Sequence, residues 1–400
     1  MKLTCILLAL PAFAATCDSL ASLSLADTKI TSAQVVAPGA FTLPTGARGA
    51  VYKTLPEFCR VTATLTPSSD SDIKVEVWLP TSGWNHKFQA VGNGGWAGVI
   101  SYGALAEGIK AGYAAASTDT GHSTPGGSFA LGHPEKLIDF SWRSEHEMTV
   151  KGKAITQAFY GDNPQRSYWN GCSTGGRQAL KEAQMFPNDF DGIIAGAPGN
   201  RNLMALWIAH AVLKNPANYV PKEKFPVIHK AVLDACDSSD GVKDGLIEDP
   251  THCHFDPGVL LCKGADGPDC LTSAQVEGVR KIYTPAKTHS GKDLFGPMAP
   301  GSELGWNVMA GGPEPYSAAV DQLRFVVFKD PAWDWRTFEF DSKDIAKFEK
   351  PENLIMNGTD PDLKKFFAHG GKLLIYQGWN DQNVSPYGTV TYFKSVQAKL

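Results

Sequence analysis

A serine between two glycines has the clearest chemical potential in this sequence. Ser173 lies in Gly171-Cys172-Ser173-Thr174-Gly175, a Gly-x-Ser-x-Gly pattern between a β-rich run and a helical run. Such a pattern presents the serine hydroxyl on a sharp strand-to-helix turn, where the next amide and the helix N-terminus stabilise an oxyanion. The pattern predicts Ser173 as the nucleophile of acyl transfer and the Thr174 N–H as an oxyanion donor. A turn serine without chemistry is the alternative.

Two further segments supply groups that such a serine needs. Residues 92–96, Gly-Asn-Gly-Gly-Trp, follow a short apolar run, the place of the second oxyanion amide in α/β-hydrolases. Gly94 and Gly95 are both candidates, and the sequence does not choose between them; a plain glycine turn is the alternative. Asp381 follows the apolar run 372–376, at the carboxyl end of an expected sheet strand. This position predicts Asp381 as the acid of a triad, against a surface-turn aspartate.

The sequence shows no histidine in the position expected for the base of such a triad. In the order Ser, Asp, His the histidine follows the acid, yet residues 382–400 contain no histidine. His122 is the best of those that precede Asp381, and we interpret it as a structural loop histidine. Because a serine hydroxyl without a proton acceptor is a poor nucleophile at neutral pH, we expect the base to lie beyond Leu400.

The elements that must position these residues alternate between short strands and helices up to about residue 199. This alternation predicts an α/β fold, an α/β-hydrolase core with an inserted lid domain. The expected strands are 73–79, 88–91, 113–117, 167–171, 192–196 and 372–376, and the expected helices are 102–111, 146–160, 175–186 and 386–400. Residues 15–199 and 369–400 form the expected catalytic domain, whose C-terminal part is apparently missing, and the loop-rich, aromatic-rich residues 200–368 form the expected lid.

Composition and the N-terminal residues restrict the binding partners and the cellular location that we expect. With 37 lysines and arginines against 41 aspartates and glutamates, the net charge is −4, and we expect no nucleic-acid partner. Residues 1–14, with Lys2 before an apolar run and a small-residue site, are predicted to be a signal peptide. No later stretch approaches roughly 20 uninterrupted apolar residues, so we expect no membrane anchor and a secreted or periplasmic protein. Of the 8 cysteines, Cys5 leaves with the signal and an odd number remains. One cysteine is then a reactive thiol, an intermolecular bridge, or lacks its partner in this chain.

Several motifs together give the sequence a specific resemblance. It resembles the tannase and feruloyl esterase family, whose members include a terephthalate-monoester hydrolase. The motifs are residues 91–96, 117–122, 168–177, 190–198, 236–247, 328–334 and 378–381. The resemblance implies a secreted serine carboxylesterase in which a Cys-Ser pair and a later His-Cys pair are joined by a disulfide. Cys172 and Ser173 match the first pair, so the partner of Cys172 is expected beyond Leu400, beside the base. The other pairings implied are Cys17–Cys59, Cys236–Cys253 and Cys262–Cys270.

An acidic loop in the expected lid is a candidate metal site. Asp237, Asp240 and Asp244 are interspersed with two glycines, a pattern that suits the several oxygen ligands of Ca²⁺. An unliganded acidic turn is the alternative. The resemblance implies a structural Ca²⁺ held by these three side chains and by main-chain oxygens of Val242 and Leu246.

The aromatic side chains of the lid suggest a flat aromatic acyl group as substrate. Trp306, Phe328 and Trp333 are candidates for binding it, with Arg324 for a carboxylate or phenolic oxygen; each could equally belong to the lid core. By resemblance the small-molecule substrates are hydroxycinnamoyl (feruloyl-type) esters. The alternatives are a tannase that acts on galloyl esters and a catalytically inactive protein that binds phenolic esters.

Overall fold

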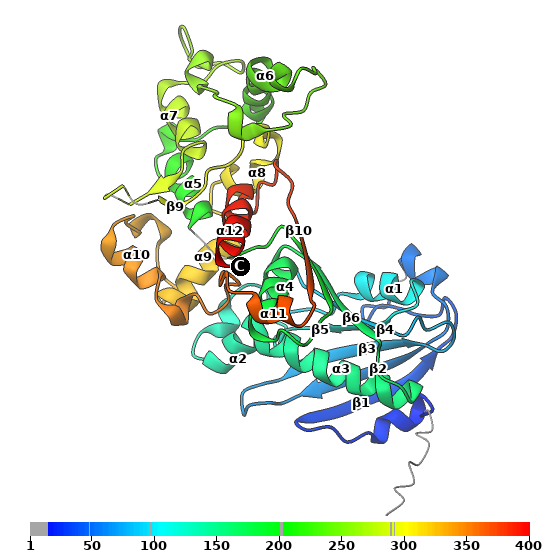
Figure 1. The fold of residues 1–400 in the computed structure, drawn as a ribbon. Helices are drawn as coiled ribbons and strands as arrows, with labels where there is room; N and C mark the ends of the chain where they lie inside the picture. Colours follow the sequence, from blue (N-terminus) through cyan, green and yellow to red (C-terminus); the bar gives the residue numbers. More distant parts are fainter. Residues whose placement is uncertain (1–14, 48, 97, 201–202, 289, 292) are drawn as a thin grey trace, which may run out of the picture.

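The structure is a computed structural model that describes residues 15–47, 49–96, 98–200, 203–288, 290–291 and 293–400 (Figure 1). The expected signal peptide, residues 1–14, lies outside the described residues. Among the described residues, no helix combines the length and apolar character needed to cross a membrane.

A mixed sheet of eight strands organises the part of the chain shown at the lower right of Figure 1. Its order is β1-β2-β3-β5-β4-β6-β7-β10. The strands are β1 (Thr28–Val36), β2 (Phe58–Leu65), β3 (Ile73–Pro80), β4 (Lys87–Val91), β5 (Ala114–Thr118), β6 (Arg166–Cys172), β7 (Gly192–Gly196) and β10 (Lys372–Tyr376). Pairing is antiparallel from β1 to β5 and parallel from β5 to β10. The carboxyl ends of β4, β6, β7 and β10 therefore meet at one edge of the sheet.

Helices cover both faces of this sheet. On one face, α3 (Ser144–Tyr160) and α4 (Thr174–Met185) share a core with Ala114 and Ala116 of β5. On the other, α1 (Tyr102–Lys110) packs with Ala115 and Trp78. Burial on both faces explains why β5 is a continuous run of small residues. The short α2 (Pro134–Ile138) and a π-helical turn, Asp139–Arg143, lead into α3.

The remaining helices form a second body between β7 and β10. They are α5 (Met204–Val212), α6 (Phe225–Cys236), α7 (Ser273–Ile282), α8 (Asn307–Ala310), α9 (Ser317–Asp321) and α10 (Ser342–Phe348), with a hairpin of β8 (Ala286–Lys287) and β9 (Asp293–Phe295). Two apolar clusters of its own, one around Ile228 and Val279 and one around Leu323 and Phe338, hold this segment together. We call it the lid; its boundaries at residues 200 and 368 stay a prediction. The chain returns through α11 (Lys364–Ala368) and ends with α12 (Pro386–Lys399) against the core.

The sequence-predicted strands and helices of the core are present, most within two residues of their expected ends. β1 and β2 were not among the predicted strands. β1 is an edge strand, and its mixture of threonine, serine and glutamine leaves no run of buried side chains.

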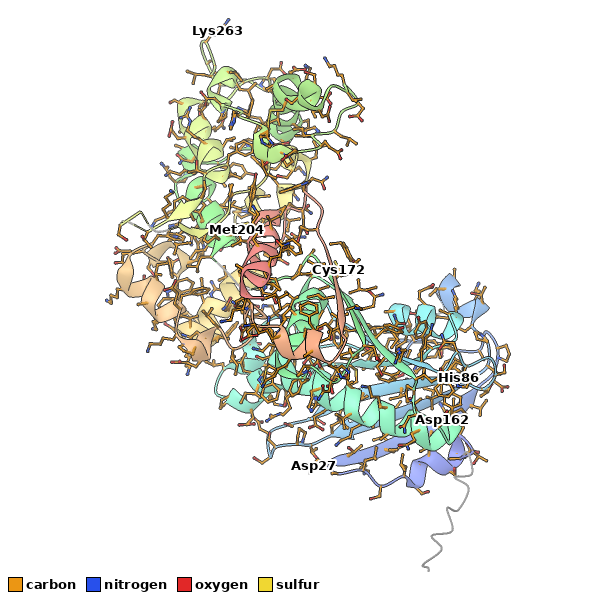
Figure 2. The ribbon with its side chains drawn as sticks, viewed as in Figure 1. Asp27, His86, Asp162, Cys172, Met204 and Lys263 are labelled. Atoms are coloured by element: carbon orange, nitrogen blue, oxygen red, sulfur yellow. A yellow bond between two sulfur atoms is a disulfide. The ribbon has the colours of Figure 1, made fainter. Side chains whose placement is uncertain are left out.

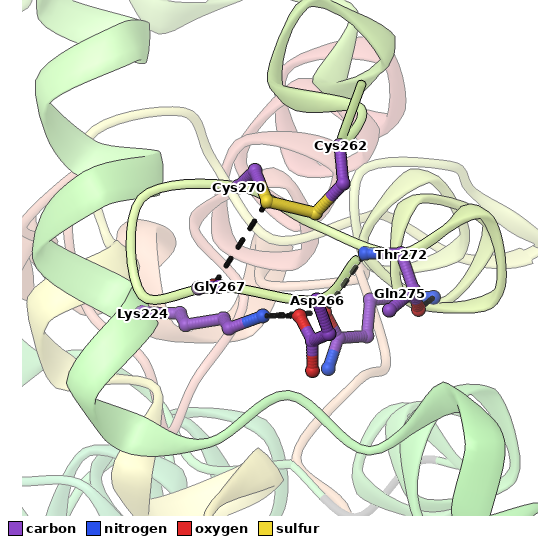
Figure 3. The surroundings of a disulfide bond; sticks show 7 residues. All are labelled: Lys224, Cys262, Asp266, Gly267, Cys270, Thr272 and Gln275. Carbon is purple, nitrogen blue, oxygen red and sulfur yellow. Dashed lines mark hydrogen bonds and ion pairs between the residues drawn. A yellow bond between two sulfur atoms is a disulfide. The ribbon is translucent and has the colours of Figure 1, made fainter. Parts of the chain in front are cut away.

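The described residues contain three disulfides, Cys17–Cys59, Cys236–Cys253 and Cys262–Cys270, which confirms the three pairings. The first joins the N-terminal turn of the chain to β2, and the other two lie within the lid. Figure 3 shows Cys262–Cys270, which closes a loop whose Asp266 pairs with Lys224 of the lid. Cys172 has a free, exposed thiol.

Candidate active site

Ser173 occupies the turn between β6 and α4 with a left-handed backbone, φ 60° and ψ −120°. For a residue with a Cβ this conformation costs on the order of 1–3 kcal/mol, so its surroundings must enforce it. The Ser173 N–H donates to Gly196 O on β7 (3.0 Å), and the Gly199 N–H donates to Ser173 O (2.9 Å). A Cβ on Gly171 would lie 2.6 Å from Gly175 O, which is why glycine is required before this turn. The structure therefore places Ser173 on a sharp strand-to-helix turn, as the sequence predicts, and its role as nucleophile stays a prediction.

The loop after β4 lies directly against the start of α4. The Gly175 N–H donates to Asn93 O (2.8 Å), and Thr174 Oγ1 donates to Gly95 O (2.7 Å). A Cβ on Gly92 would lie 2.5 Å from the Gly175 Cα, so the two backbones touch. As the first residue of α4, Thr174 has no acceptor for its N–H inside the helix. The two predicted sources of oxyanion amides are therefore brought together beside Ser173.

A buried polar network fixes this loop from the second turn of α4. Gln178 Oε1 accepts from the Asn93 N–H (3.0 Å), and Gln178 Nε2 donates to Asn93 Oδ1 (3.1 Å) and to Glu145 of α3. Asn93 Nδ2 donates in turn to Thr118 O (2.9 Å) and Val99 O (3.0 Å). Burial raises the pKa of Glu145 to about 7, although Arg177 opposes the shift. We call Asn93, Gln178 and Glu145 the loop clamp.

Arg177 connects α4 to segments far away in the sequence. Its fully buried guanidinium donates to Ser141 O (2.9 Å), Phe140 O (3.2 Å) and Met356 O (2.6 Å). Burial lowers the pKa of Arg177 to about 10, a value that still keeps it charged at neutral pH. The helix behind Ser173 is thus fixed both to the core and to the segment that returns from the lid.

A cavity opens at Ser173, between the sheet edge and the lid. Figure 2 labels Cys172, the last residue of β6, and Met204, the first residue of α5. The core contributes Gly95, Ser173, Thr174, Gly199, Asn200, Asn383 and Val384, and the lid contributes Met204, Ala205, Met309, Tyr316, Ala319 and Gln322. Of the two candidate glycines, Gly95 lines the cavity and Gly94 does not.

Asp381 lies in the turn after β10, at the same sheet edge as Ser173 because β6, β7 and β10 are parallel neighbours. Its Oδ1 accepts from the N–H groups of Asn383 (2.8 Å) and Val384 (3.0 Å), and its Oδ2 accepts from Gln377 Nε2 (3.0 Å). Asn383 and Val384 also line the cavity, so this turn forms part of its wall.

Among the described residues that line the cavity there is no histidine. His122 lies instead in a neighbouring hollow with Asp119 and Lys136, stacked on Phe129 at 3.7 Å. Its Nδ1 lies 3.1 Å from Thr124 O, and burial lowers the pKa of His122 to about 4. Its Nε2 is buried without a hydrogen-bond partner among the described residues, and its interpretation as a structural histidine stays a prediction.

The predicted substrate-binding side chains do not reach the cavity, which corrects that prediction. Trp306 is fully buried in the lid core, where its Nε1 donates to Ser302 Oγ (2.9 Å). Phe328 stacks on Trp333 at 4.7 Å, and Arg324 Nε donates to Trp333 O (3.2 Å). These aromatic side chains stabilise the lid because they pack against one another.

The side chains that the lid does present to Ser173 were missed. Met204, Tyr316 and Gln322 line the cavity, with Asn200 from the end of the core. No local pattern marks them, since only the packing of α5 and α9 over the sheet edge brings them to the serine. Gln178 was missed too, although it lies one helical turn beyond Thr174, on the same face of α4.

The acidic loop of the lid forms a series of tight turns. Asp237 is buried and accepts from the N–H groups of Asp244 (3.3 Å) and Gly245 (3.1 Å). Asp240 accepts from the Val242 N–H (2.8 Å), and Asp244 accepts from the Leu246 N–H (3.1 Å). Within the described chain, these three carboxylates do not come within 4.8 Å of one another. The donor set is nonetheless entirely oxygen, which suits Ca²⁺.

Comparison with known proteins gives a consistent result. The sequence model of the family described as "Tannase and feruloyl esterase" matches residues 59–400. The chain is 38% identical over 412 residues to an uncharacterized esterase of Xanthomonas campestris, covering 96% of this chain and 70% of that protein. It is 37% identical over 347 residues to a probable feruloyl esterase B-2 of Aspergillus terreus, covering 85% of this chain and 65% of that protein.

Two solved structures have the same fold as this chain. The crystal structure of feruloyl esterase B from Aspergillus oryzae superposes with a TM-score of 0.89 at 33% identity, covering 96% of this chain and 78% of that one. Tannin acyl hydrolase from Aspergillus niger matches with a TM-score of 0.76 at 21% identity, covering 94% and 74%, and shows the same fold. The predicted α/β-hydrolase core is therefore confirmed.

Proposed function

Because the chain belongs to the tannase and feruloyl esterase family, we propose that the protein is a carboxylic ester hydrolase that uses Ser173 as its nucleophile. The observation that carries the proposal is the left-handed turn at Ser173, which opens into a cavity shared with Thr174 and Gly95. The chain spans 70% and 65% of the two curated relatives described above.

In the proposed mechanism, Ser173 Oγ attacks the ester carbonyl carbon while a base takes its proton. The N–H groups of Thr174 and Gly95 donate to the carbonyl oxygen as it becomes negative. The C–O bond to the alcohol then breaks, and the alcohol leaves with the proton from the base. Water attacks the acyl-Ser173 ester in the same way, which releases the carboxylic acid and restores the serine.

Asp381 is the proposed acid that orients the base. Its Oδ2 accepts one hydrogen bond, from Gln377, and so keeps capacity to accept an imidazole N–H. The proposed base is a histidine beyond Leu400 whose neighbouring cysteine would pair with Cys172. The exposed Cys172 thiol, next to Ser173, is well placed for such a bridge.

The proposed substrates are esters of hydroxycinnamic acids. Met204 and Tyr316 supply an apolar thioether and an aromatic ring, and Asn200 and Gln322 supply amide groups, a combination that suits a flat ring with polar substituents. Feruloyl esterases among the relatives favour this class over galloyl esters.

We also propose that the acidic lid loop holds a structural Ca²⁺ and that the protein is exported. Asp237, Asp240 and Asp244, with main-chain oxygens of Val242 and Leu246, are the proposed ligands; the positive φ values of Gly241 and Gly245 allow the sharp turns between them. Three disulfides support an oxidising compartment.

The test of the function is hydrolysis of methyl ferulate and methyl gallate by two chains, one ending at Leu400 and one extended through the reading frame that follows it. We expect turnover of methyl ferulate by the extended chain and its loss in Ser173→Ala. Robust turnover by the chain ending at Leu400 would contradict the proposed base, and faster turnover of methyl gallate would contradict the substrate class.

A further inference from the structure

A histidine and two carboxylates converge beside the C-terminal half of α4, and none of them lines the cavity at Ser173. They are His146 of α3, Glu182 of α4 and Asp189 of the loop before β7. One potential ligand atom from each lies within 4.8 Å of the others, and His146 Nδ1 lies 2.7 Å from Asp189 Oδ2. Three different segments of the chain thus bring their side chains to one point.

Glu182 gives this cluster an unsatisfied ligand. Its side chain is 1% exposed, and its Oε2 has no hydrogen-bond partner within the described part of the chain. A buried polar oxygen without a partner is costly, and a hydrogen bond or a bound cation removes that cost. The nearby Lys153 donates to the main-chain oxygen of Asp189 and not to Glu182. A cation among the three side chains would satisfy Glu182 Oε2.

The chemical types of the three potential ligands indicate which cation they would bind. One imidazole and two carboxylates match Zn²⁺, which combines nitrogen and oxygen ligands, whereas Ca²⁺ takes oxygen ligands alone. The site is also supported and accessible. Phe186 stacks on the His146 ring at 3.8 Å, and the His146 and Asp189 side chains remain 26% and 15% exposed, which leaves a side open for a water ligand.

The other such group in the described chain serves as a contrast. Cys262, Asp266 and Cys270 also lie close together, but their sulfur atoms form a disulfide and Asp266 pairs with Lys224 at 2.5 Å (Figure 3). Those ligand atoms are already used, whereas Glu182 Oε2 is not.

We propose that His146, Glu182 and Asp189 form a binding site for a divalent transition-metal ion, best matched by Zn²⁺. The ion would join α3, α4 and the loop before β7 behind the helix that follows Ser173. Its role is structural, because none of its ligands lines the cavity at Ser173.

The test is Zn²⁺ binding to the intact protein, measured by isothermal titration calorimetry with excess Ca²⁺ present to occupy oxygen-only sites. We expect one Zn²⁺ per chain and an affinity lower by on the order of 100-fold in His146→Gln and Glu182→Gln. His133→Gln is the matched control. His133 Nδ1 likewise lies 3.1 Å from a carboxylate oxygen, that of Asp70, but no third ligand joins them in the described chain. This variant should bind as the unmodified protein does.

Equal Zn²⁺ affinity in the unmodified protein and in both cluster variants would overturn the proposal. If those variants do not fold, a crystal of the unmodified protein soaked in Zn²⁺ decides. An anomalous peak between His146, Glu182 and Asp189 supports the site, and a peak only elsewhere, or none, overturns it.

Discussion

Gln178 and Asn93 hold each other through two hydrogen bonds of opposite direction. The Asn93 N–H donates to Gln178 Oε1 (3.0 Å), and Gln178 Nε2 donates to Asn93 Oδ1 (3.1 Å). Asn93 precedes the two candidate glycines, Gly94 and Gly95, and Gln178 lies one helical turn after Thr174 on α4. One helix therefore positions both the serine and the loop that must face it.

Replacing Gln178 by leucine should slow turnover more than it weakens substrate binding. The volume is nearly kept, but Asn93 loses its two hydrogen bonds to Gln178, so the loop that carries Gly95 is held less firmly. We expect kcat to fall by about 10- to 100-fold with little change in KM, since loss of an oxyanion donor itself costs roughly 10²–10³. Steady-state kinetics of the extended chain measure both constants. Gln184→Leu is the control, because Gln184 lies on the same helix and donates to Tyr392 Oη (3.0 Å), far from the loop. An unchanged kcat in Gln178→Leu would argue against the loop clamp.

A second prediction concerns two glycines of the same loop. A Cβ at Gly92 would lie 2.5 Å from the Gly175 Cα, whereas a Cβ at Gly94 would meet nothing within 4 Å. Gly92→Ala must push two backbones apart, and we expect it to destabilise the protein by about 1–3 kcal/mol. Gly94→Ala should leave stability nearly unchanged. Urea denaturation compares the two, and equal losses would show that the contact with Gly175 is not tight.

Calcium removal provides a third prediction. A ligand that binds only the folded state raises the free energy of unfolding by about 2.7 kcal/mol at 100 times its Kd. We expect a chelator to lower the melting temperature of the protein, and Asp237→Asn to lower it without any further effect of Ca²⁺. Asp256→Asn is the control, because Asp256 is an exposed lid aspartate outside this loop, paired with Arg280 at 2.8 Å. A melting temperature that is the same with and without Ca²⁺ would contradict the proposed Ca²⁺ site.

The loop clamp also predicts a pH dependence of stability. Burial raises the pKa of Glu145 to about 7, above the value near 4.3 of an unfolded chain. Between these values the folded state binds more protons than the unfolded state, so this group makes stability fall as the pH rises from about 4.5 to 7. Glu145→Gln mimics the protonated form and should flatten that part of the stability curve. Unfolding at several pH values tests this, with Glu147→Gln on the same helix as control. Parallel curves for Glu145→Gln and the unmodified protein would contradict it.

The sequence was informative where chemistry is local. Short segments contain the turn at Ser173, the helix that follows it and the strand before Asp381. Their glycines and apolar runs can be recognised in the sequence without knowledge of the fold. The sequence located the loop of residues 92–96 but did not choose between Gly94 and Gly95. That choice depends on which of the two glycines lines the cavity under the lid, and this is Gly95.

The residues that line the cavity could not be predicted from the sequence in the same way. An aromatic-rich lid sequence is compatible with both a binding surface and a core, and Trp306, the clearest aromatic candidate, belongs to the core. Tyr316 and Gln322 reach the serine only because α9 and the turn after it lie over the sheet edge. Such contacts arise between segments more than a hundred residues apart, and no local pattern records them. The Glu182 cluster was missed for the same reason.

Arg177 has a mechanical consequence. Its guanidinium joins α4 to the carbonyl oxygens of Phe140 and Ser141 on one side and of Met356 on the other. The segment around Met356, which returns from the lid, is therefore fixed to the helix that follows Ser173. The opposite wall of the cavity, to which α5 and α9 contribute residues, does not take part in these three hydrogen bonds. An ester larger than the cavity is therefore better accommodated by displacement of that wall than by displacement of the segment around Met356, which Arg177 holds to α4.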